Sequence, residues 1–221
     1  MESKRKDEQG VAKKKPRRTL IYTVVMALYA ILVKVVFFMR IEGRENIPKG
    51  KNVVLMGNHQ CILDPLTLAL CTPDREIHFM GKKELFQNRL FGWVLRKVHA
   101  FPVDRGNIDM GAVRTAMNVL KDGDTLGIFP EGTRSRTGHM LPLLGGASMI
   151  ALKSGCDVVP VYIDGRYKPF RRMKVYIGRS VAMDDLRAGR MGRESVDALA
   201  ERIQASFSEL SGGKSLPPAE G

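Results

Sequence analysis

Hydrophobic and polar positions divide the chain into three parts of different character. Residues 1–18 are polar and strongly basic, and they show no apolar period. Residues 19–39 are almost continuously apolar, and from residue 40 onward short apolar runs alternate with amphipathic segments. Because a basic stretch without apolar periodicity has too little surface to bury, we expect residues 1–18 to form a disordered arm.

The region from residue 40 to residue 210 has the pattern of an α/β domain. Apolar runs of strand length predict strands at 52–57, 76–80, 99–103, 124–129, 157–163 and 173–177. Segments with helical periodicity predict helices at 65–71, 82–87, 89–98, 108–121, 147–154 and 193–210. Strands that alternate with helices favour a mostly parallel central sheet flanked by helices. Residues 211–221 are rich in glycine and proline, and we expect them to form a flexible tail.

The apolar segment 19–39 predicts a helix that associates with a membrane. Such a helix would extend roughly 30 Å, which is enough to cross a bilayer core. Lys34 lies inside the segment, however, and a charge deep in a bilayer is unfavourable unless its side chain reaches the interface. The basic arm favours a cytoplasmic N-terminus, so a single span would place residues 40–221 on the opposite side. A helix that lies in the membrane interface avoids this conflict, while a single span and a buried core helix remain open.

The formal net charge of +13 and the pI near 9.9 indicate a negatively charged partner or surface. Nucleic acid, anionic lipid and phosphorylated substrates all fit this charge. The run Lys13–Arg18 makes a nucleic-acid-binding protein a distant alternative, but residues 40–221 contain no such motif, and we expect no nucleic-acid partner. The cysteines have no metal-type spacing, which favours a reducing compartment and no metal site.

A first polar cluster, Asn58-His59-Gln60-Cys61-Ile62-Leu63-Asp64, follows a predicted strand, where open α/β sheets build their sites. If the loop folds back, the Asp64 carboxylate can accept a hydrogen bond from one imidazole nitrogen of His59 and leave the other to take a proton. No activated serine or cysteine accompanies the pair, which favours a substrate hydroxyl as the nucleophile. Because Pro65 follows, Asp64 could instead serve only as the N-cap of the next helix.

A second polar cluster, Phe129-Pro130-Glu131-Gly132-Thr133-Arg134-Ser135, follows another predicted strand. Gly132 allows the backbone to approach a ligand closely, and Arg134 can bind a phosphate group through two parallel hydrogen bonds. Arg105 also follows a predicted strand and could bind the same anion, and Lys82 is a further candidate. These residues alone leave a solvated surface turn as the alternative.

The chain resembles the glycerolipid acyltransferase family, which carries four sequence blocks in a fixed order. Asn58-His59 and Asp64 match the first block, and Phe101 and Arg105 match the second. The third block is present without change at residues 129–135, and residues 158–161 match the fourth, an apolar strand with a proline. The resemblance covers about residues 40–180.

The resemblance implies an α/β domain that an N-terminal helical element holds on the cytoplasmic face of the cell membrane. It implies transfer of a fatty acyl group from acyl-CoA or acyl-carrier protein to the free hydroxyl of lysophosphatidate, giving phosphatidate, with no cofactor beyond the acyl donor. His59 and Asp64 would be the catalytic residues. The block residues that would bind substrate are Asn58, Phe101, Arg105, Glu131, Gly132, Thr133 and Arg134.

One segment departs from the family pattern. Many relatives have a basic residue in the segment that corresponds to residues 142–147, which here is apolar and rich in glycine. The chain therefore lacks one expected phosphate ligand. Acylation of glycerol 3-phosphate or of another lysolipid remains open beside acylation of lysophosphatidate.

Overall fold

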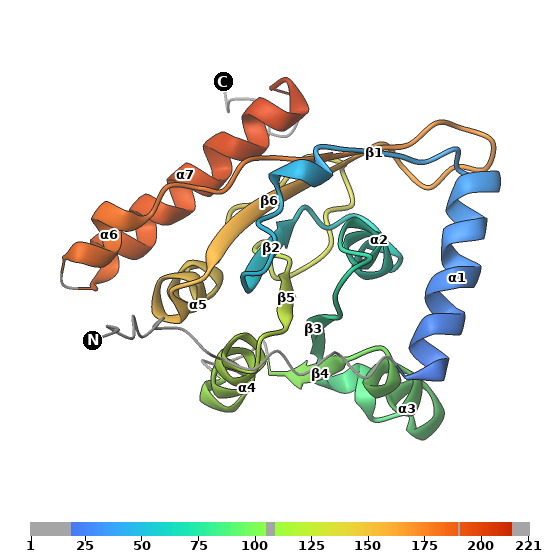
Figure 1. Ribbon diagram of the computed structural model, residues 1–221, viewed down its shortest axis with the longest axis horizontal. Coiled ribbons are helices and arrows are strands. Elements are labelled where there is room, and N and C mark those ends of the chain that lie inside the picture. The colour runs from blue at the N-terminus through green and yellow to red at the C-terminus, as the bar shows by residue number, and fades with distance from the viewer. Residues whose placement is uncertain (1–18, 105–108, 190, 214–221) are drawn as a thin grey trace, which may run out of the picture.

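The computed structural model describes residues 19–104, 109–189 and 191–213 (Figure 1). The strands are β1 (Arg40–Glu42), β2 (Val53–Gly57), β3 (Ile77–Lys82), β4 (Ala100–Val103), β5 (Thr125–Ile128), β6 (Asp157–Asp164) and β7 (Lys174–Ile177). The helices are α1 (Leu20–Val35), α2 (Asp64–Cys71), α3 (Arg89–Lys97), α4 (Met110–Lys121), α5 (Gly145–Ser154), α6 (Asp184–Ala188) and α7 (Arg193–Ser211), with 3-10 helices η1 (Arg44–Asn46) and η2 (Lys83–Phe86). The expectations for residues 1–18 and 214–221 lie outside the described residues.

The strands form a sheet in the order β1-β7-β6-β2-β5-β3-β4. Neighbouring strands from β6 to β4 pair in parallel, whereas β7 is antiparallel to β6 and parallel to β1. Every residue of β2 is buried, as expected for a central strand of a sheet that is covered on both faces. The predicted α/β fold with a mostly parallel central sheet flanked by helices is therefore confirmed.

Alternate residues of each strand divide between two hydrophobic cores, one on each face of the sheet. Val54 and Met56 of β2 pack in a core with α4, α5 and α7. Val53 and Leu55 point to the opposite face and pack in a core with α1 and α2 (Figure 1). This division follows from the two-residue period of a strand. The strands therefore hold the loops at their ends rigidly, since their own side chains are fixed on both faces.

Helix α1 packs against the domain instead of extending away from it. Tyr29, Val33 and Phe37 are buried in the core that α2 also lines. The helix ends at Val35, before residue 39, where the predicted segment ends, and it is 16 residues long, or about 24 Å. No helix in the described part of the chain is both long enough and apolar enough to cross a membrane.

The other differences from the predicted elements are local. The predicted helix at 82–87 is only the short η2, because β3 continues to Lys82. Strand β1 and helix α6 were not predicted, since elements of three and five residues are too short to show a period. Helix α4 begins at Met110, after Asp109 caps it by accepting a hydrogen bond from the Ala112 amide.

Candidate active site

The two polar clusters lie at the same edge of the sheet. The first follows β2 and the second follows β5, and these strands are parallel neighbours. Lys82 ends β3, which pairs in parallel with β5 on one side and with β4 on the other. Carboxyl ends of adjacent parallel strands meet at one edge, where α/β proteins bind their ligands. Arg105 comes shortly after β4 but lies outside the described residues.

His59 and Asp64 form a hydrogen-bonded pair in the loop after β2. The Nδ1 atom of His59 lies 2.9 Å from Oδ2 of Asp64, and the two residues are 9% and 0% exposed. The backbone amides of Gln60 and Cys61 donate to the same carboxylate oxygen at 2.6 and 2.7 Å, so the loop folds around the carboxylate. A proton on Nδ1 satisfies the contact with Asp64 and leaves Nε2 to accept a proton from a substrate.

Asp64 does not cap helix α2 in the way that the sequence suggests. The N-cap residue is Leu63, and Asp64 is the first residue of the helix, with Pro65 directly behind it. The carboxylate turns back toward the preceding loop instead of bonding to the first amides of the helix. The N-cap alternative is therefore wrong, and the carboxylate is used by His59 and its loop.

Glu131 joins the two clusters through the backbone. Its Oε1 accepts a hydrogen bond from the His59 amide at 2.7 Å, and its Oε2 accepts one from the Leu141 amide at 2.8 Å. Burial raises the pKa of this carboxyl group to about 7, against the opposing effect of the two hydrogen bonds. The Ser135 amide donates to the His59 carbonyl at 2.8 Å, so the second cluster holds the His59 backbone from both sides.

The ring of His59 is also fixed by packing, and the turn beside it requires glycine. The imidazole stacks on Phe129, with ring centroids 4.1 Å apart and an interplanar angle of 21°. Gly132 has a φ of +68°, and a Cβ atom there would lie 2.3 Å from the side chain of Leu144. Only glycine fits this left-handed position next to Leu144. The turn therefore brings the following residues, Thr133 and Arg134, to the surface.

The cationic side chains near the two polar clusters differ in whether a carboxylate already pairs with them. Arg134 is exposed, and no carboxylate of the described residues pairs with it. Lys82 is exposed as well, with its Nζ 3.5 Å from Glu84 Oε1. Lys83 is held by Asp104, whose Oδ2 lies 2.7 Å from its Nζ. Arg134 is thus more available to an anion than Lys82 or Lys83.

Two residues of the predicted substrate-binding set, Asn58 and Phe101, make contacts within the protein. Asn58 is buried, its Nδ2 donates to the Ile163 carbonyl at 3.2 Å, and its Oδ1 accepts from the Ile163 amide at 2.7 Å. Its side chain thereby ties the end of β2 to β6. Phe101 of β4 is half-buried and packs against the core on the α4 and α5 face.

The sequence interpretation missed Tyr167, which lies beyond β6. Its hydroxyl donates to Oδ1 of Asp64 at 2.9 Å, although the two residues are 103 positions apart in the chain. No spacing pattern reveals such a contact, because it depends on how β6 pairs with β2. The nearest sequence signal is the fourth block, residues 158–161, which lies within β6.

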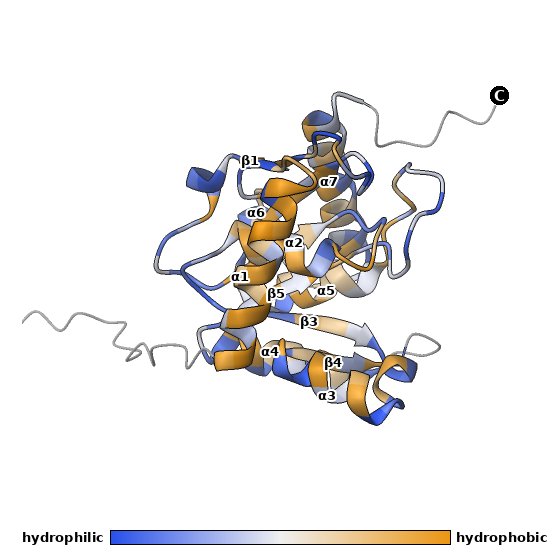
Figure 2. Ribbon diagram, turned by 90° about the vertical axis from the view of Figure 1, so that its right-hand side faces the viewer, coloured by the Kyte–Doolittle hydropathy of each residue, from blue (hydrophilic) through white to orange (hydrophobic). Residues whose placement is uncertain are grey.

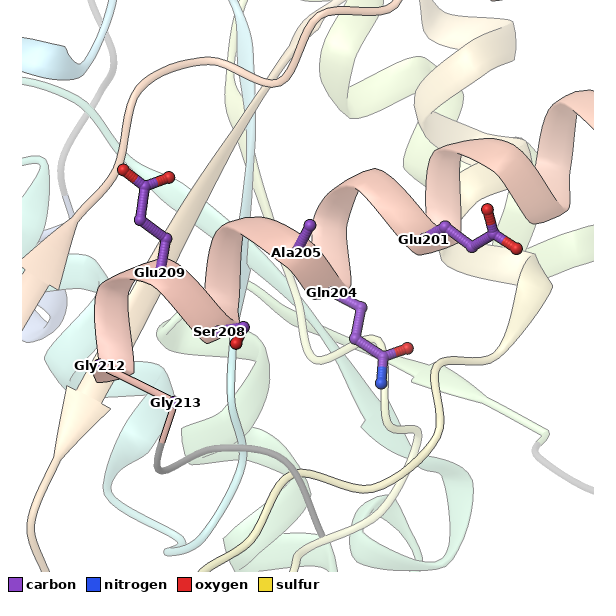
Figure 3. A pocket seen from close by; sticks show the side chains of 7 residues that line it. All are labelled: Glu201, Gln204, Ala205, Ser208, Glu209, Gly212 and Gly213. Carbon is purple, nitrogen blue, oxygen red and sulfur yellow. The ribbon is translucent and has the colours of Figure 1, made fainter. Parts of the chain in front are cut away.

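One cavity of the described residues lies apart from the two polar clusters. A hollow of about 640 Å³ lies along α7, lined by Glu201, Gln204, Ala205, Ser208, Glu209, Gly212 and Gly213 (Figure 3). It contains none of the residues of the two polar clusters. Within the described ranges, no group of three or more histidine, cysteine or carboxylate side chains could hold a metal ion.

Known proteins resemble this chain over the region that carries the two polar clusters. A family model described as Acyltransferase matches residues 38–164, a stretch that contains all four sequence blocks. A 1-acyl-sn-glycerol-3-phosphate acyltransferase of Bacillus subtilis (strain 168) is 35% identical over 177 residues, which cover 78% of this chain and 87% of that protein. A Streptococcus pneumoniae protein of the same name is 34% identical over 176 residues, covering 76% of this chain and 64% of that protein.

A solved structure shares the architecture. The crystal structure of the 1-acyl-sn-glycerophosphate (LPA) acyltransferase PlsC from Thermotoga maritima matches with a TM-score of 0.63 at 27% identity. The match covers 87% of this chain and 77% of that one. The family model and the relatives show that the chain belongs to the acyltransferase family.

Proposed function

We propose that this enzyme transfers a fatty acyl group from an acyl thioester to the free hydroxyl of lysophosphatidate, giving phosphatidate. The observation that carries the proposal is the pairing of His59 with Asp64 at 2.9 Å, at the sheet edge where Arg134 is also exposed. The names of the two bacterial relatives support lysophosphatidate as the acceptor. Either acyl-CoA or acyl-carrier protein would supply the thioester.

His59 would act as the general base. Its Nδ1–H donates to Asp64, and Nε2 takes the proton of the acceptor hydroxyl while the hydroxyl oxygen attacks the thioester carbonyl carbon. The tetrahedral intermediate then collapses, the carbon–sulfur bond breaks, and the imidazolium returns its proton to the leaving thiolate. The Asp64 carboxylate stabilises the imidazolium between these two steps. The products are an ester and a free thiol, with no net change in protons.

The acceptor phosphate would lie over the second cluster. Arg134 can bind it through two parallel hydrogen bonds, and Lys82 can add a point charge from the neighbouring strand. Arg105 belongs to the same proposal by its position after β4. In the apolar segment 142–147, the Leu144 amide donates to the Pro130 carbonyl at 2.8 Å, so this segment supports the turn of the second cluster without supplying a charge.

We place the enzyme on the cytoplasmic face of the cell membrane, held there by α1. Leu20, Leu28, Ile31 and Val35 are 79%, 63%, 61% and 58% exposed, and their spacing of three, four or eight residues puts them on one side of the helix. Figure 2 views this side of the molecule, where α1 is largely hydrophobic. A continuous exposed apolar stripe marks a contact surface. A membrane fits best, because the proposed acceptor is a membrane lipid.

An acyl-transfer assay with a panel of acceptors tests this function. Purified enzyme would be supplied with labelled acyl-CoA or acyl-carrier protein and with lysophosphatidate, glycerol 3-phosphate or lysophosphatidylcholine. We expect the highest kcat/KM with lysophosphatidate, and loss of activity with every acceptor in His59→Ala. A preference for glycerol 3-phosphate would replace the proposed acceptor, and a preference for lysophosphatidylcholine, whose phosphate is esterified with choline, would contradict the assignment of a free phosphate group to Arg134.

A further inference from the structure

A chain of hydrogen bonds connects α1 to Asp64. The Tyr29 hydroxyl of α1 lies 2.6 Å from Thr67 Oγ1 of α2, and Thr67 Oγ1 lies 2.7 Å from the Tyr167 hydroxyl. Tyr167 in turn donates to Asp64 Oδ1 at 2.9 Å. Thr67 and Tyr29 are buried, so water does not compete easily for these contacts.

The protons of this chain run in one direction. Burial and the nearby Asp64 carboxylate raise the pKa of Tyr167, which therefore keeps its proton and donates it to Asp64. Its oxygen can then only accept, and the donor is Thr67. With its proton on Tyr167, Thr67 can only accept from Tyr29, whose hydroxyl also donates to the Leu63 carbonyl at 3.3 Å and whose pKa burial raises to about 12. Each hydroxyl thereby sets the orientation of the next.

We propose that Tyr167 is a positioning residue for Asp64, and that Tyr29 links the packing of α1 to the orientation of the catalytic pair. The proposal rests on the proposed roles of His59 and Asp64. Oδ2 of Asp64 already serves His59 and two backbone amides, whereas the bond from Tyr167 is made by Oδ1. Without that bond, Oδ1 has no partner among the described residues, and only the contacts of Oδ2 orient the carboxylate toward the imidazole.

Tyr167→Phe tests the proposal because it removes only the hydroxyl oxygen. We expect kcat to fall roughly 10–100-fold, the usual effect of losing a hydrogen bond to a charged group, while KM for both substrates changes less than about twofold. Thr67→Val should give a smaller fall in kcat. Tyr162→Phe is the matched control, since Tyr162 is a buried tyrosine of β6 on the opposite face of the sheet, and its kcat should be unchanged.

A double-mutant cycle separates positioning from a general loss of stability. In an Asp64→Asn background, Tyr167→Phe should cause no further loss, because the carboxylate that it orients is gone. If Tyr167→Phe lowers kcat as much in that background as in the wild type, the positioning role is overturned. It is also overturned if Tyr167→Phe alone keeps the wild-type kcat while His59→Ala is inactive. Activity in His59→Ala itself would overturn the proposed function instead, so the two failures are distinguishable.

A second, independent feature lies where α1 ends. Phe38 and Phe170 both have left-handed backbones, with φ of 41° and 60°, and both side chains are exposed. Such backbones are unfavourable for bulky residues and tend to occur where function requires them. The Phe170 amide donates to the Val36 carbonyl at 2.7 Å and the Met173 amide to the Phe37 carbonyl at 3.1 Å, which holds the two segments together.

A cavity of about 430 Å³ at this corner combines charge with apolar surface. It is lined by Lys34, Phe38, Met39, Arg40, Phe170 and Arg172. None of its three cations pairs with a carboxylate of the described residues. The cavity adjoins the end of α1, whose Val35 belongs to the exposed stripe.

We infer that this cavity binds the headgroup of an anionic phospholipid, with Phe38 and Phe170 among the acyl chains. The inference rests on the proposed attachment of α1 to the membrane. Three cations that form no ion pair with the described carboxylates match an anionic phosphate, and the two exposed rings match the apolar region beneath it. The cavity would thereby hold α1 at a fixed depth in the interface.

Vesicle co-sedimentation of the full-length protein tests this site. The vesicles would contain phosphatidylcholine alone or phosphatidylcholine with phosphatidylglycerol. We expect Arg40→Gln with Arg172→Gln to lose about 10–30-fold in affinity for the anionic vesicles, from about 1 kcal/mol per charge near the surface. Lys121→Gln with Lys153→Gln removes the same charge from exposed positions of α4 and α5, and we expect it to lose less than about threefold.

The outcomes separate the site from membrane attachment in general. Equal losses in the two double variants would overturn the site, because the preference for anionic lipid would then reflect only net charge. Wild-type protein that fails to bind neutral vesicles would contradict the attachment through α1. We expect all variants to bind neutral vesicles equally. If only Arg40→Gln with Arg172→Gln then loses the additional affinity for anionic vesicles, the cavity site and the attachment through α1 are both supported.

Discussion

Asp64 is the residue on which the polar contacts of the site converge, since its carboxylate serves His59, Tyr167 and the loop amides between positions 59 and 64. An asparagine can keep the contacts of Oδ2 through its carbonyl oxygen and can donate to the Tyr167 oxygen through its amide. We therefore expect Asp64→Asn to fold normally but to lose acyl transfer by about 10²–10⁴-fold, because the charge opposite the imidazolium is gone. Steady-state kinetics and thermal melting of the same preparation check both parts. A melting temperature far below that of the wild type would mean that the variant reports on folding and not on charge.

The raised pKa of Glu131 predicts how the free energy of unfolding depends on pH. Burial raises the pKa of its carboxyl group from 4.5 to about 7, so the folded protein holds this proton more tightly than the unfolded chain does. The contribution of Glu131 to the free energy of unfolding is therefore largest below pH 4.5 and falls as the pH rises through 7, by up to about 3 kcal/mol. Glutamine does not titrate, so the difference in unfolding free energy between wild type and Glu131→Gln should shift in favour of the variant from pH 5 to pH 8. A difference that stays constant over this range would contradict the raised pKa.

Substitution of Arg134 should weaken binding of the acceptor more than it lowers kcat. Because its guanidinium is exposed and has no carboxylate partner in the described structure, Arg134→Ala should leave the fold intact and raise KM for lysophosphatidate about 10–100-fold. Lysine restores the charge but not the two parallel hydrogen bonds, so Arg134→Lys should recover only part of the affinity. Titration of acceptor at saturating donor measures this, and unchanged KM in both variants would remove Arg134 from the phosphate site.

At the scale of elements, α1 has one face on the domain and one face exposed. Replacing Leu28, Ile31 and Val35 by serine changes only the exposed face, so the fold should persist while flotation with vesicles is lost. High salt should weaken the attraction of basic residues to anionic lipid but should not release the wild type, because burial of apolar side chains is not screened. Release of the wild type by salt alone would show that charge, and not α1, attaches the enzyme.

The elements that the sequence predicted are those with enough residues to show a period. The buried run of β2 and the alternating helices of the domain were predicted from their pattern, whereas β1 and α6 were too short for one. Helix α1 ends at Val35, and the left-handed backbone of Phe38 that follows is a conformation that no propensity of phenylalanine indicates. The loop that bends His59 onto Asp64 was predicted because both ends lie within one short segment. Tyr167 was not, because only the folded sheet brings it to Asp64.

At the scale of the whole molecule, the sheet determines where the chemistry lies. Parallel pairing of β2 with β5 and of β5 with β3 brings His59, Arg134 and Lys82 to one edge, although they lie in three separate segments of the chain. Helix α1 packs over the same face of the sheet as α2, the helix that begins with Asp64. His59, Arg134 and the apolar stripe of α1 are thus positioned by one sheet, which suits the proposed acceptor, whose hydroxyl, phosphate and acyl chain must be bound together.

The most direct test of this account is the rate of acyl transfer to lysophosphatidate by wild type and His59→Ala under saturating donor and acceptor. The structure predicts a loss of about 10²–10⁴-fold in kcat for His59→Ala in a protein that still folds, because the variant loses the base but keeps the backbone contacts of residue 59 with Glu131 and Ser135. A His59→Ala enzyme that turns over lysophosphatidate at the wild-type rate would contradict the proposed mechanism.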